Sequence, residues 1–103
     1  MIARMWTARA APAAAPAYAE HLRLHVLPAL RQLDGYAGAW LLERAEGETT
    51  EIIVITWWAS LEAIQAFAGA DVESAVVAEE AAALLTEFDP RVRHYMLVLR
   101  HTP

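Results

Sequence analysis

The stretch from Glu51 to Gly69 constrains the fold more than any other part of the sequence, because it opens with the uncharged run from Ile52 to Ile55. A run of β-branched residues is typical of a strand that is buried on both faces. The run continues through Thr56 into Trp57 and Trp58, and neighbouring residues of a strand point to opposite faces. Each face of the predicted sheet therefore carries a large aromatic ring that has to be covered.

Composition restricts the remaining possibilities. With 103 residues, we predict one domain spanning residues 1–103. The chain has no Cys, which excludes disulfides, a thiolate nucleophile and Cys-ligated zinc. Its net charge is −5 and its Arg residues are scattered, so we expect no nucleic-acid partner. No apolar run approaches the ~20 residues of a membrane span, and Arg4 and Arg9 interrupt the region where a signal peptide would be apolar. We expect a cytoplasmic protein with no membrane partner.

Strand and helix patterns alternate along the chain. Strands are predicted over residues 1–9, 36–46, 51–58 and 91–100, and helices over residues 13–33, 60–68 and 72–87. Pro28 should kink the first helix, and Gly47 should turn a hairpin between the second and third strands. The order βαββαβ with right-handed crossovers predicts an α+β, ferredoxin-like fold, with a four-stranded antiparallel sheet and the helices on one face.

Alternation along the strands separates two faces. One face is almost wholly apolar and is expected to lie under the helices; it collects Ala3, Met5, Ala37, Ala39, Leu41, Ile53, Ile55, Trp57, Tyr95, Leu97 and Leu99. The other face holds three Trp and some polar groups, among them Arg4, Trp6, Trp40, Thr56, Trp58 and His94. Monomers rarely expose so large an apolar patch, so a second copy of the chain should cover it. The expected product is a homodimer, a dimeric α/β barrel, whose two sheets enclose a lumen for a small hydrophobic or aromatic ligand.

Four sequence motifs carry a family resemblance, and together they span nearly the whole chain. They are YAGAW at residues 36–40, WASLEA at 58–63, AFAG at 66–69 and VRHY at 92–95. With these motifs, after a Pro-containing first helix, the chain resembles the antibiotic biosynthesis monooxygenase family of small dimeric α/β-barrel proteins. The resemblance implies an activity of one of several kinds. Characterised members oxidise quinol or anthrone-type polyketides without metal or flavin, degrade haem, or act as isomerases or signal-turnover enzymes. It implies no cofactor and no metal for the first of these activities.

The sequence also departs from that family pattern. The polyketide-oxidising and haem-degrading branches use an Asn beside a Trp, and this chain contains no Asn. The haem branch further uses a His from the second helical region, whereas no His lies between His25 and His94. Haem degradation by that route is therefore not expected, and catalytic polar groups have to come from elsewhere in the chain.

Seven residues are candidates for the site. His94 is the candidate general base for a phenolic substrate, because a His that titrates near neutrality suits that step; the alternative is a His that is simply hydrogen-bonded to a neighbour such as Thr56. Arg4 is a candidate for orienting a phenolate oxygen, or else an ion-pair partner at the interface. The remaining candidates are the ring-stacking residues Trp6, Trp40 and Trp58, which are otherwise interface packing, the polar lumen residue Thr56, and His25 at the barrel mouth.

Two functions remain open. One is a cofactor-independent monooxygenase in which His94 deprotonates a small planar aromatic and the resulting anion reacts with O₂. The other is a non-catalytic dimeric barrel that binds a small hydrophobic metabolite, with an isomerase-type use of the same cavity as a further alternative. The pair His21 and His25, four residues apart on a helix, has the spacing of a metal pair, but no third ligand accompanies it, so no metal is expected.

Overall fold

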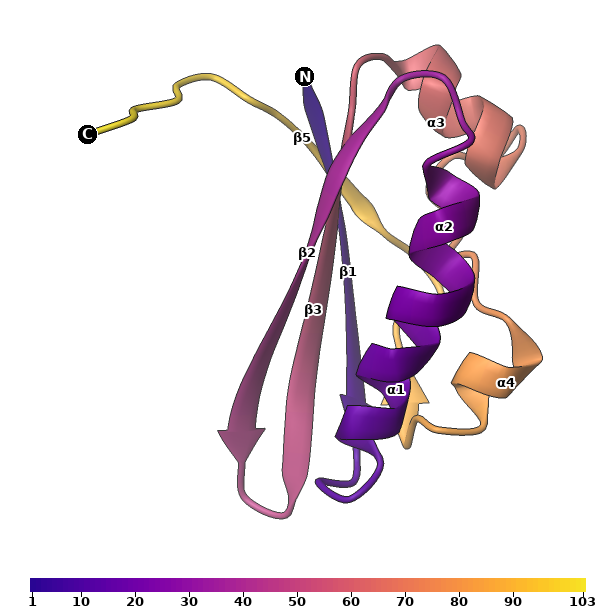
Figure 1. Ribbon diagram of the computed structural model, residues 1–103, viewed down its shortest axis with the longest axis vertical. Coiled ribbons are helices and arrows are strands. Elements are labelled where there is room, and N and C mark those ends of the chain that lie inside the picture. Colours follow the sequence, from indigo (N-terminus) through magenta and orange to yellow (C-terminus); the bar gives the residue numbers. More distant parts are fainter.

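The structure, a computed structural model, describes residues 1–103. It consists of one antiparallel sheet with the helices on one side (Figure 1). The five strands are β1 (Ile2–Ala10), β2 (Tyr36–Glu46), β3 (Thr49–Trp58), β4 (Glu87–Phe88) and β5 (Arg93–Met96). Their order is β2-β3-β1, and both short strands β4 and β5 pair with β1. The predicted α+β ferredoxin-like fold is confirmed, with β1 and β3 at the centre of the sheet.

The first crossover is a helix in three consecutive pieces. These are α1 (Ala15–His21), the π-helical turn η1 (Leu22–Val26) and α2 (Leu27–Leu30). Pro28 has no N–H to donate to the preceding turn, and the wide π turn before it lets the N–H of Leu27 bond to the carbonyl of Leu22. The irregularity predicted from Pro28 is thus present as a π turn.

The second crossover differs from its prediction. Helix α3 (Leu61–Ala68) forms where expected, with the Ser60 hydroxyl accepting from the N–H of Ala63 at 3.2 Å. The helix predicted over residues 72–87 is wrong, because only α4 (Glu79–Ala82) is helical there. Backbone groups of the preceding segment bond to another part of the chain instead. The N–H of Ala75 donates to Pro90 at 2.9 Å, and Glu73 accepts from Val92 at 2.8 Å.

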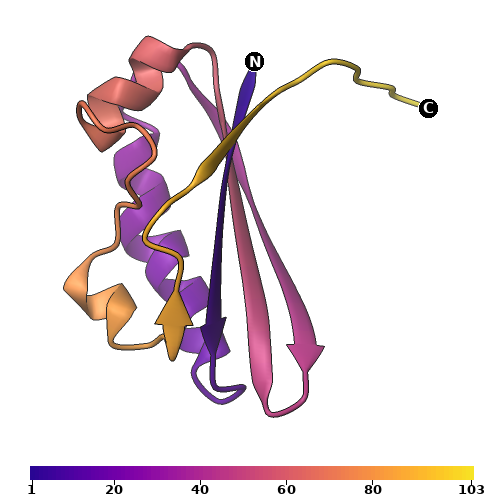
Figure 2. The same cartoon turned by 180° about the vertical axis from the view of Figure 1, so that it is seen from behind.

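The final strand is also shorter than predicted. Regular pairing covers only Arg93–Met96, after which Leu97 donates one further hydrogen bond, to the carbonyl of Met1 at 3.0 Å. The segment from there to Pro103 leads away from the sheet on the side opposite the helices (Figure 2). No helix of the chain combines the length and the apolar character that crossing a bilayer requires.

The core lies between the sheet and the helices. Ile52 of β3 packs with Tyr18 and Leu22 of the first crossover, while Trp58 of β3 packs with Leu30 and Ile64. Ile52, Trp58 and Ile64 are completely buried, and burying an aliphatic side chain of this kind contributes about 2 kcal/mol.

This packing reverses the predicted assignment of the two faces for β1 and β3, whereas Trp40 of β2 lies away from the helices as predicted. The residues of β1 and β3 that were expected to face a partner lie under the helices, among them Arg4, Trp6, Thr56 and Trp58. Trp40 lies on the other side of the sheet, packed edge-on against Trp57 with ring centroids 5.4 Å apart. We call this other side the open face; it carries Met5, Trp40, Leu42, Ile53, Ile55, Trp57 and Tyr95.

Candidate functional site

A largely apolar cavity lies between the sheet and the first crossover helix. Its volume is about 80 Å³, and twelve of the fifteen residues that line it are hydrophobic. The sheet contributes Trp6 and Val54, and the helix contributes Tyr18 and Leu22. Val76 belongs to the irregular segment that follows α3 and lies on the same wall as Val77 and Ala78. The cavity is thus covered by the helices and by a segment without regular secondary structure.

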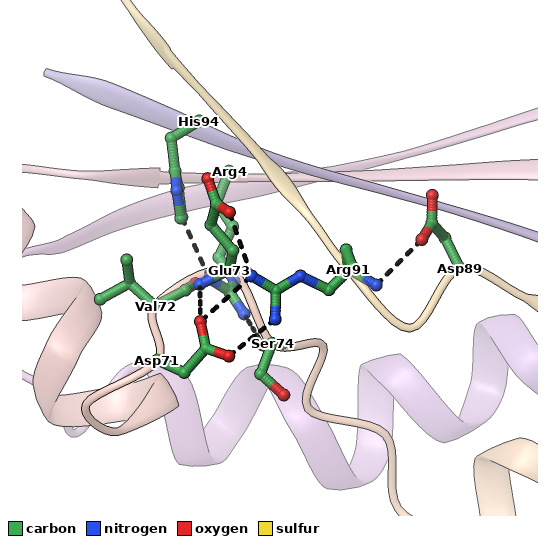
Figure 3. Close-up of polar contacts among 8 residues, drawn as sticks. All are labelled: Arg4, Asp71, Val72, Glu73, Ser74, Asp89, Arg91 and His94. Atoms are coloured by element: carbon green, nitrogen blue, oxygen red, sulfur yellow. Dashed lines mark hydrogen bonds and ion pairs between the residues drawn. The ribbon is translucent and has the colours of Figure 1, made fainter.

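Arg4 of β1 lines this cavity on the side of the sheet and is only 4% exposed. Its Nη2 donates to the carbonyl of Ser74 at 2.7 Å, and its Nη1 donates to the carbonyl of Val72 and lies 3.0 Å from Nε2 of His94 (Figure 3). Burial lowers the pKa of Arg4, but a guanidinium stays protonated at neutral pH. Its hydrogen bonds are therefore made within the chain, and they hold the irregular segment after α3 that forms one wall of the cavity.

An external ion-pair cluster holds the same segment from its solvent side. Arg91 contacts Asp71 at 2.7 Å and Glu73 at 3.1 Å, and its backbone N–H donates to the Asp89 carboxylate at 2.9 Å (Figure 3). All of these side chains are exposed, so each pair is individually weak. The segment from Asp71 to Ser74 thus lies between a buried Arg and an exposed one.

His94 lies beside Arg4 and is not among the residues lining the cavity. Because a guanidinium has only N–H donors, Nε2 of His94 accepts, which leaves the proton of the neutral ring on Nδ1. Burial lowers the pKa of His94, the charge of Arg4 lowers it further, and Glu73 acts in the opposite direction. The ring is therefore neutral at pH 7, with its Nε2 lone pair already used.

The structure brings Trp6 and Thr56 to the cavity together with Arg4. The indole Nε1 of Trp6 donates to the carbonyl of Asp89 at 2.7 Å, which leaves the ring face along the wall. Thr56 accepts from Nε1 of Trp58 at 2.8 Å. Trp58 itself does not line the cavity; it stacks on Phe67 with ring centroids 5.5 Å apart and belongs to the core.

Two other candidates lie apart from this cavity. Trp40 is on the open face. His25 is exposed and lines a neighbouring groove with His21, Val26, Ala78 and Glu80. No group of three or more His, Asp or Glu side chains is arranged to hold a metal ion.

Two cavity residues, Tyr18 and His21, were not among the predicted site residues. Tyr18 is 3% exposed, and burial strongly raises the pKa of its hydroxyl, so it stays protonated. Nε2 of His21 is buried and has no hydrogen-bond partner. The spacing of Tyr18, His21 and Leu22, three and four residues apart, places all three on one helix face, which is the sequence signal that identifies them.

Comparison with solved structures supports this fold along the whole chain. The haem degrader MhuD of Mycobacterium tuberculosis, solved with two haems in its active site, is 25% identical with a TM-score of 0.65, covering 99% of this chain and 100% of that one. A Streptomyces coelicolor monooxygenase solved with nanaomycin D is 19% identical with a TM-score of 0.62, covering 99% and 89%. A Bacillus cereus protein assigned to the antibiotic biosynthesis monooxygenases is 14% identical with a TM-score of 0.68, covering 99% and 95%.

Sequence comparison identifies the family. No curated protein sequence matches this chain significantly. The family model described as antibiotic biosynthesis monooxygenase, however, matches residues 1–79, which include β1, the crossover helix, the β2–β3 hairpin and α3. Since this match spans well over half of the chain, the protein belongs to the antibiotic biosynthesis monooxygenase family.

Proposed function

We propose that the protein is a cofactor-independent monooxygenase that oxidises a small phenolic substrate in the cavity between the sheet and the first crossover helix. The observation that carries the proposal is the cavity itself, an apolar chamber with the indole of Trp6 on one wall and the phenol ring of Tyr18 on another. Apolar walls with a few polar groups are the usual form of a small-molecule site. Two structural neighbours were solved with small-molecule ligands, haem in one and nanaomycin D in the other.

The proposed reaction needs only a base and O₂. A base takes the phenolic proton, and the electron-rich phenolate passes an electron to O₂. The radical pair joins to form a carbon–oxygen bond at the ring carbon opposite the hydroxyl. Loss of the hydrogen on that carbon and cleavage of the O–O bond then release water, so that phenol and O₂ give quinone and water. The walls of the cavity exclude bulk water and hold the ring in place.

The site differs from the one expected from sequence, which was a lumen between two sheets. Arg4, Trp6 and Thr56 remain in the proposed site because they line the cavity on the helix side of the sheet. We assign His94 a positioning role, since its Nε2 is held by Arg4 and it does not border the cavity. Trp58 does not line the cavity but holds Thr56 in place through the hydrogen bond from its Nε1.

The volume restricts the substrate. A cavity of about 150 Å³ holds one benzene ring, whereas this one has about 80 Å³. A single aromatic ring therefore enters only if a wall moves outward, and the irregular wall around Val76 and Val77 is the part without helix or strand bonds to break. A haem macrocycle does not fit the cavity in this conformation.

We also propose that the protein acts as a homodimer through the open face. Trp40 is 56% exposed and lies next to half-buried aliphatic residues of β3, and Tyr95 is 47% exposed on β5, at the other edge of the same face. A contiguous apolar surface of this kind is typical of an interface between subunits. The dimer would leave the cavity uncovered, because the cavity lies on the opposite side of the sheet.

A non-catalytic binding protein is the second candidate, and one observation favours it. Arg4 and Thr56, two polar side chains of the cavity wall, are already hydrogen-bonded within the chain. A protein that only sequesters an apolar metabolite would need no free catalytic group.

Oxygen consumption with phenol as the probe separates the two functions. The monooxygenase proposal predicts O₂ uptake that is stoichiometric with quinone formation and is lost in the Ala78→Phe variant, which fills the cavity wall from an exposed position. The matched control Ala45→Phe, on the exposed end of β2, should keep the activity. Saturable binding without O₂ uptake would support the binding protein instead, and the absence of both would contradict both functions.

A further inference from the structure

Two buried side-chain atoms of the chain lack a hydrogen-bond partner, Nε2 of His21 and Nε1 of Trp57. Buried polar atoms are nearly always paired, so each such atom calls for an explanation. Trp57 belongs to the open face, where the proposed dimer would cover it. His21 lines the cavity, so a molecule inside the cavity is its available partner.

The other polar side chains of the cavity wall are either already hydrogen-bonded or unable to act as a base at neutral pH. Arg4 donates to Val72 and Ser74, and Thr56 accepts from Trp58. The neutral Tyr18 hydroxyl is a donor and acceptor but no base at neutral pH, since burial raises its pKa. His21 is therefore the cavity residue whose chemistry suits an acceptor of a substrate proton.

We propose that Nε2 of His21 accepts the hydrogen bond of the substrate's phenolic hydroxyl and takes its proton as the general base, an inference that rests on the proposed function. In this step the O–H bond breaks, the proton forms an N–H bond at Nε2, and the electron pair remains on the phenolate oxygen. The proposal specifies the ligand class as an aromatic ring with a hydroxyl directed at α1.

The position of His21 also gives the proton a route away from the cavity. His21 lines both the cavity and the neighbouring groove, which is shared with His25 and Glu80. The rings of His21 and His25 are 5.6 Å apart, and the ring of Tyr18 is 6.5 Å from that of His21 on the cavity side. A protonated His21 would thus lie between the apolar cavity and a neighbouring groove that carries the Glu80 carboxylate.

Two matched probes, phenol and toluene, test the hydrogen bond because they differ only in the group that would meet His21. In His21→Phe, the ratio of the Kd of phenol to that of toluene should rise about fivefold relative to wild type, as expected for one lost hydrogen bond. His101→Phe is the control, since this exposed His of the C-terminal segment does not line the cavity or the groove, and it should leave the ratio unchanged. In wild type, the ¹⁵N resonance of Nε2 in His21 should shift on adding phenol and not on adding toluene.

The outcomes separate this inference from the proposed function. If both probes bind but the ratio is the same in wild type and His21→Phe, or if the Nε2 resonance does not respond to phenol, the role of His21 is refuted while the cavity remains a ligand site. If neither probe binds to wild type, the proposed function fails, and the inference fails with it. The more conservative His21→Gln keeps an acceptor and should retain phenol binding with O₂ uptake lost, which separates a base from a simple binding contact.

Discussion

Arg4 and His94 face one another across directly paired positions of β1 and β5, with 3.0 Å between Nη1 and Nε2. The same guanidinium bonds to the carbonyls of Val72 and Ser74, so one buried cation joins the sheet to the irregular segment that closes the cavity. Because the acceptors are two carbonyls and a neutral ring, the charge has no carboxylate partner in hydrogen-bonding contact. Arg4 therefore acts as a clamp between the sheet and this segment, and its loss should destabilise the cavity wall.

The first prediction concerns this clamp. Replacing Arg4 by Met keeps most of the buried volume but leaves three acceptors without their donor, and we expect a loss of about 3 kcal/mol in the free energy of unfolding. Urea unfolding followed by Trp fluorescence measures it. The control is Arg31→Met, an exposed Arg at the end of α2 with no side-chain hydrogen bond or ion pair, which should change stability by less than about 0.5 kcal/mol. Equal effects of the two substitutions would contradict the clamp.

The second prediction is a pH dependence that originates at His94. Its pKa in the folded protein lies below the ordinary value of 6.5, first because of burial and then because of the charge of Arg4. On acidification the unfolded chain therefore binds this proton before the folded protein does, so the contribution to stability is present above pH 6.5 and is lost as the pH falls through the folded pKa.

Urea unfolding at pH 7.5, 6.5 and 5.5 compares wild type with His94→Gln, whose side-chain oxygen still accepts from Arg4. The wild type should lose more stability than the variant between the upper and the lower pH. His21 and His25 are present in both proteins and cancel in the comparison. Parallel pH profiles for the two proteins would show that His94 is not held neutral by its surroundings.

The order of strands and helices could be predicted from the sequence because it depends on local signals. These are the apolar run from Ile52 to Ile55, the turn at Gly47 and the caps at Ser60 and Gly69. The assignment of faces failed for two reasons. The more uniformly apolar side of β1 and β3 was expected under the helices, whereas the side with Arg4, Thr56 and Trp58 lies there. The grouping of β2 with β3 failed because it depends on register. The hairpin closes with Glu46 opposite Thr49, so an even-numbered residue of β2 pairs with an odd-numbered residue of β3. Trp40 is therefore opposite Ile55 and shares the open face with Trp57 instead of the helix side with Trp58.

Only part of the site could be predicted from the sequence, because the rest depends on contacts between distant segments. Alternation grouped Arg4, Trp6 and Thr56 correctly, because all three lie on paired positions of two neighbouring strands. No local pattern reveals that Arg4 bonds to Val72 and Ser74, which are 68 and 70 positions away in the sequence. The Ala- and Val-rich segment after Gly69 reads as a helix, and its backbone bonds to Pro90 and Val92 decide otherwise.

The third prediction compares two glycines with positive φ. Gly35 (φ 86°) ends the first crossover, and a Cβ added there would lie 2.6 Å from Cβ of Ala63 in α3. Gly47 (φ 61°) lies in the hairpin loop with open space around it. Gly47→Ala should cost about 1 kcal/mol of conformational strain alone. Gly35→Ala should cost at least about 2 kcal/mol more, because overpacking against α3 adds to the strain.

Thermal and urea unfolding of both variants measure that difference. The double variant Gly35→Ala, Ala63→Gly provides the control, since removing the Cβ of Ala63 relieves the contact and leaves the strain. It should be less destabilised than expected from adding the two single changes. Strict additivity would mean that the close approach of the first crossover to α3 is not the cause.

The last prediction tests the proposed dimer with a pair of substitutions matched in exposure. Trp40 is 56% exposed on the open face, and Leu24 is 54% exposed on the first crossover helix, on the other side of the sheet. Placing an Arg at the centre of an apolar interface buries a charge without a partner, so Trp40→Arg should convert the dimer to a monomer. Leu24→Arg introduces the same charge at the same exposure and should leave the dimer intact. Sedimentation equilibrium at micromolar concentration, with circular dichroism to verify folding, distinguishes these outcomes. A wild-type protein that sediments as a single chain, or a Trp40→Arg variant that stays dimeric, would remove the open face as the interface and leave its exposed Trp without an explanation.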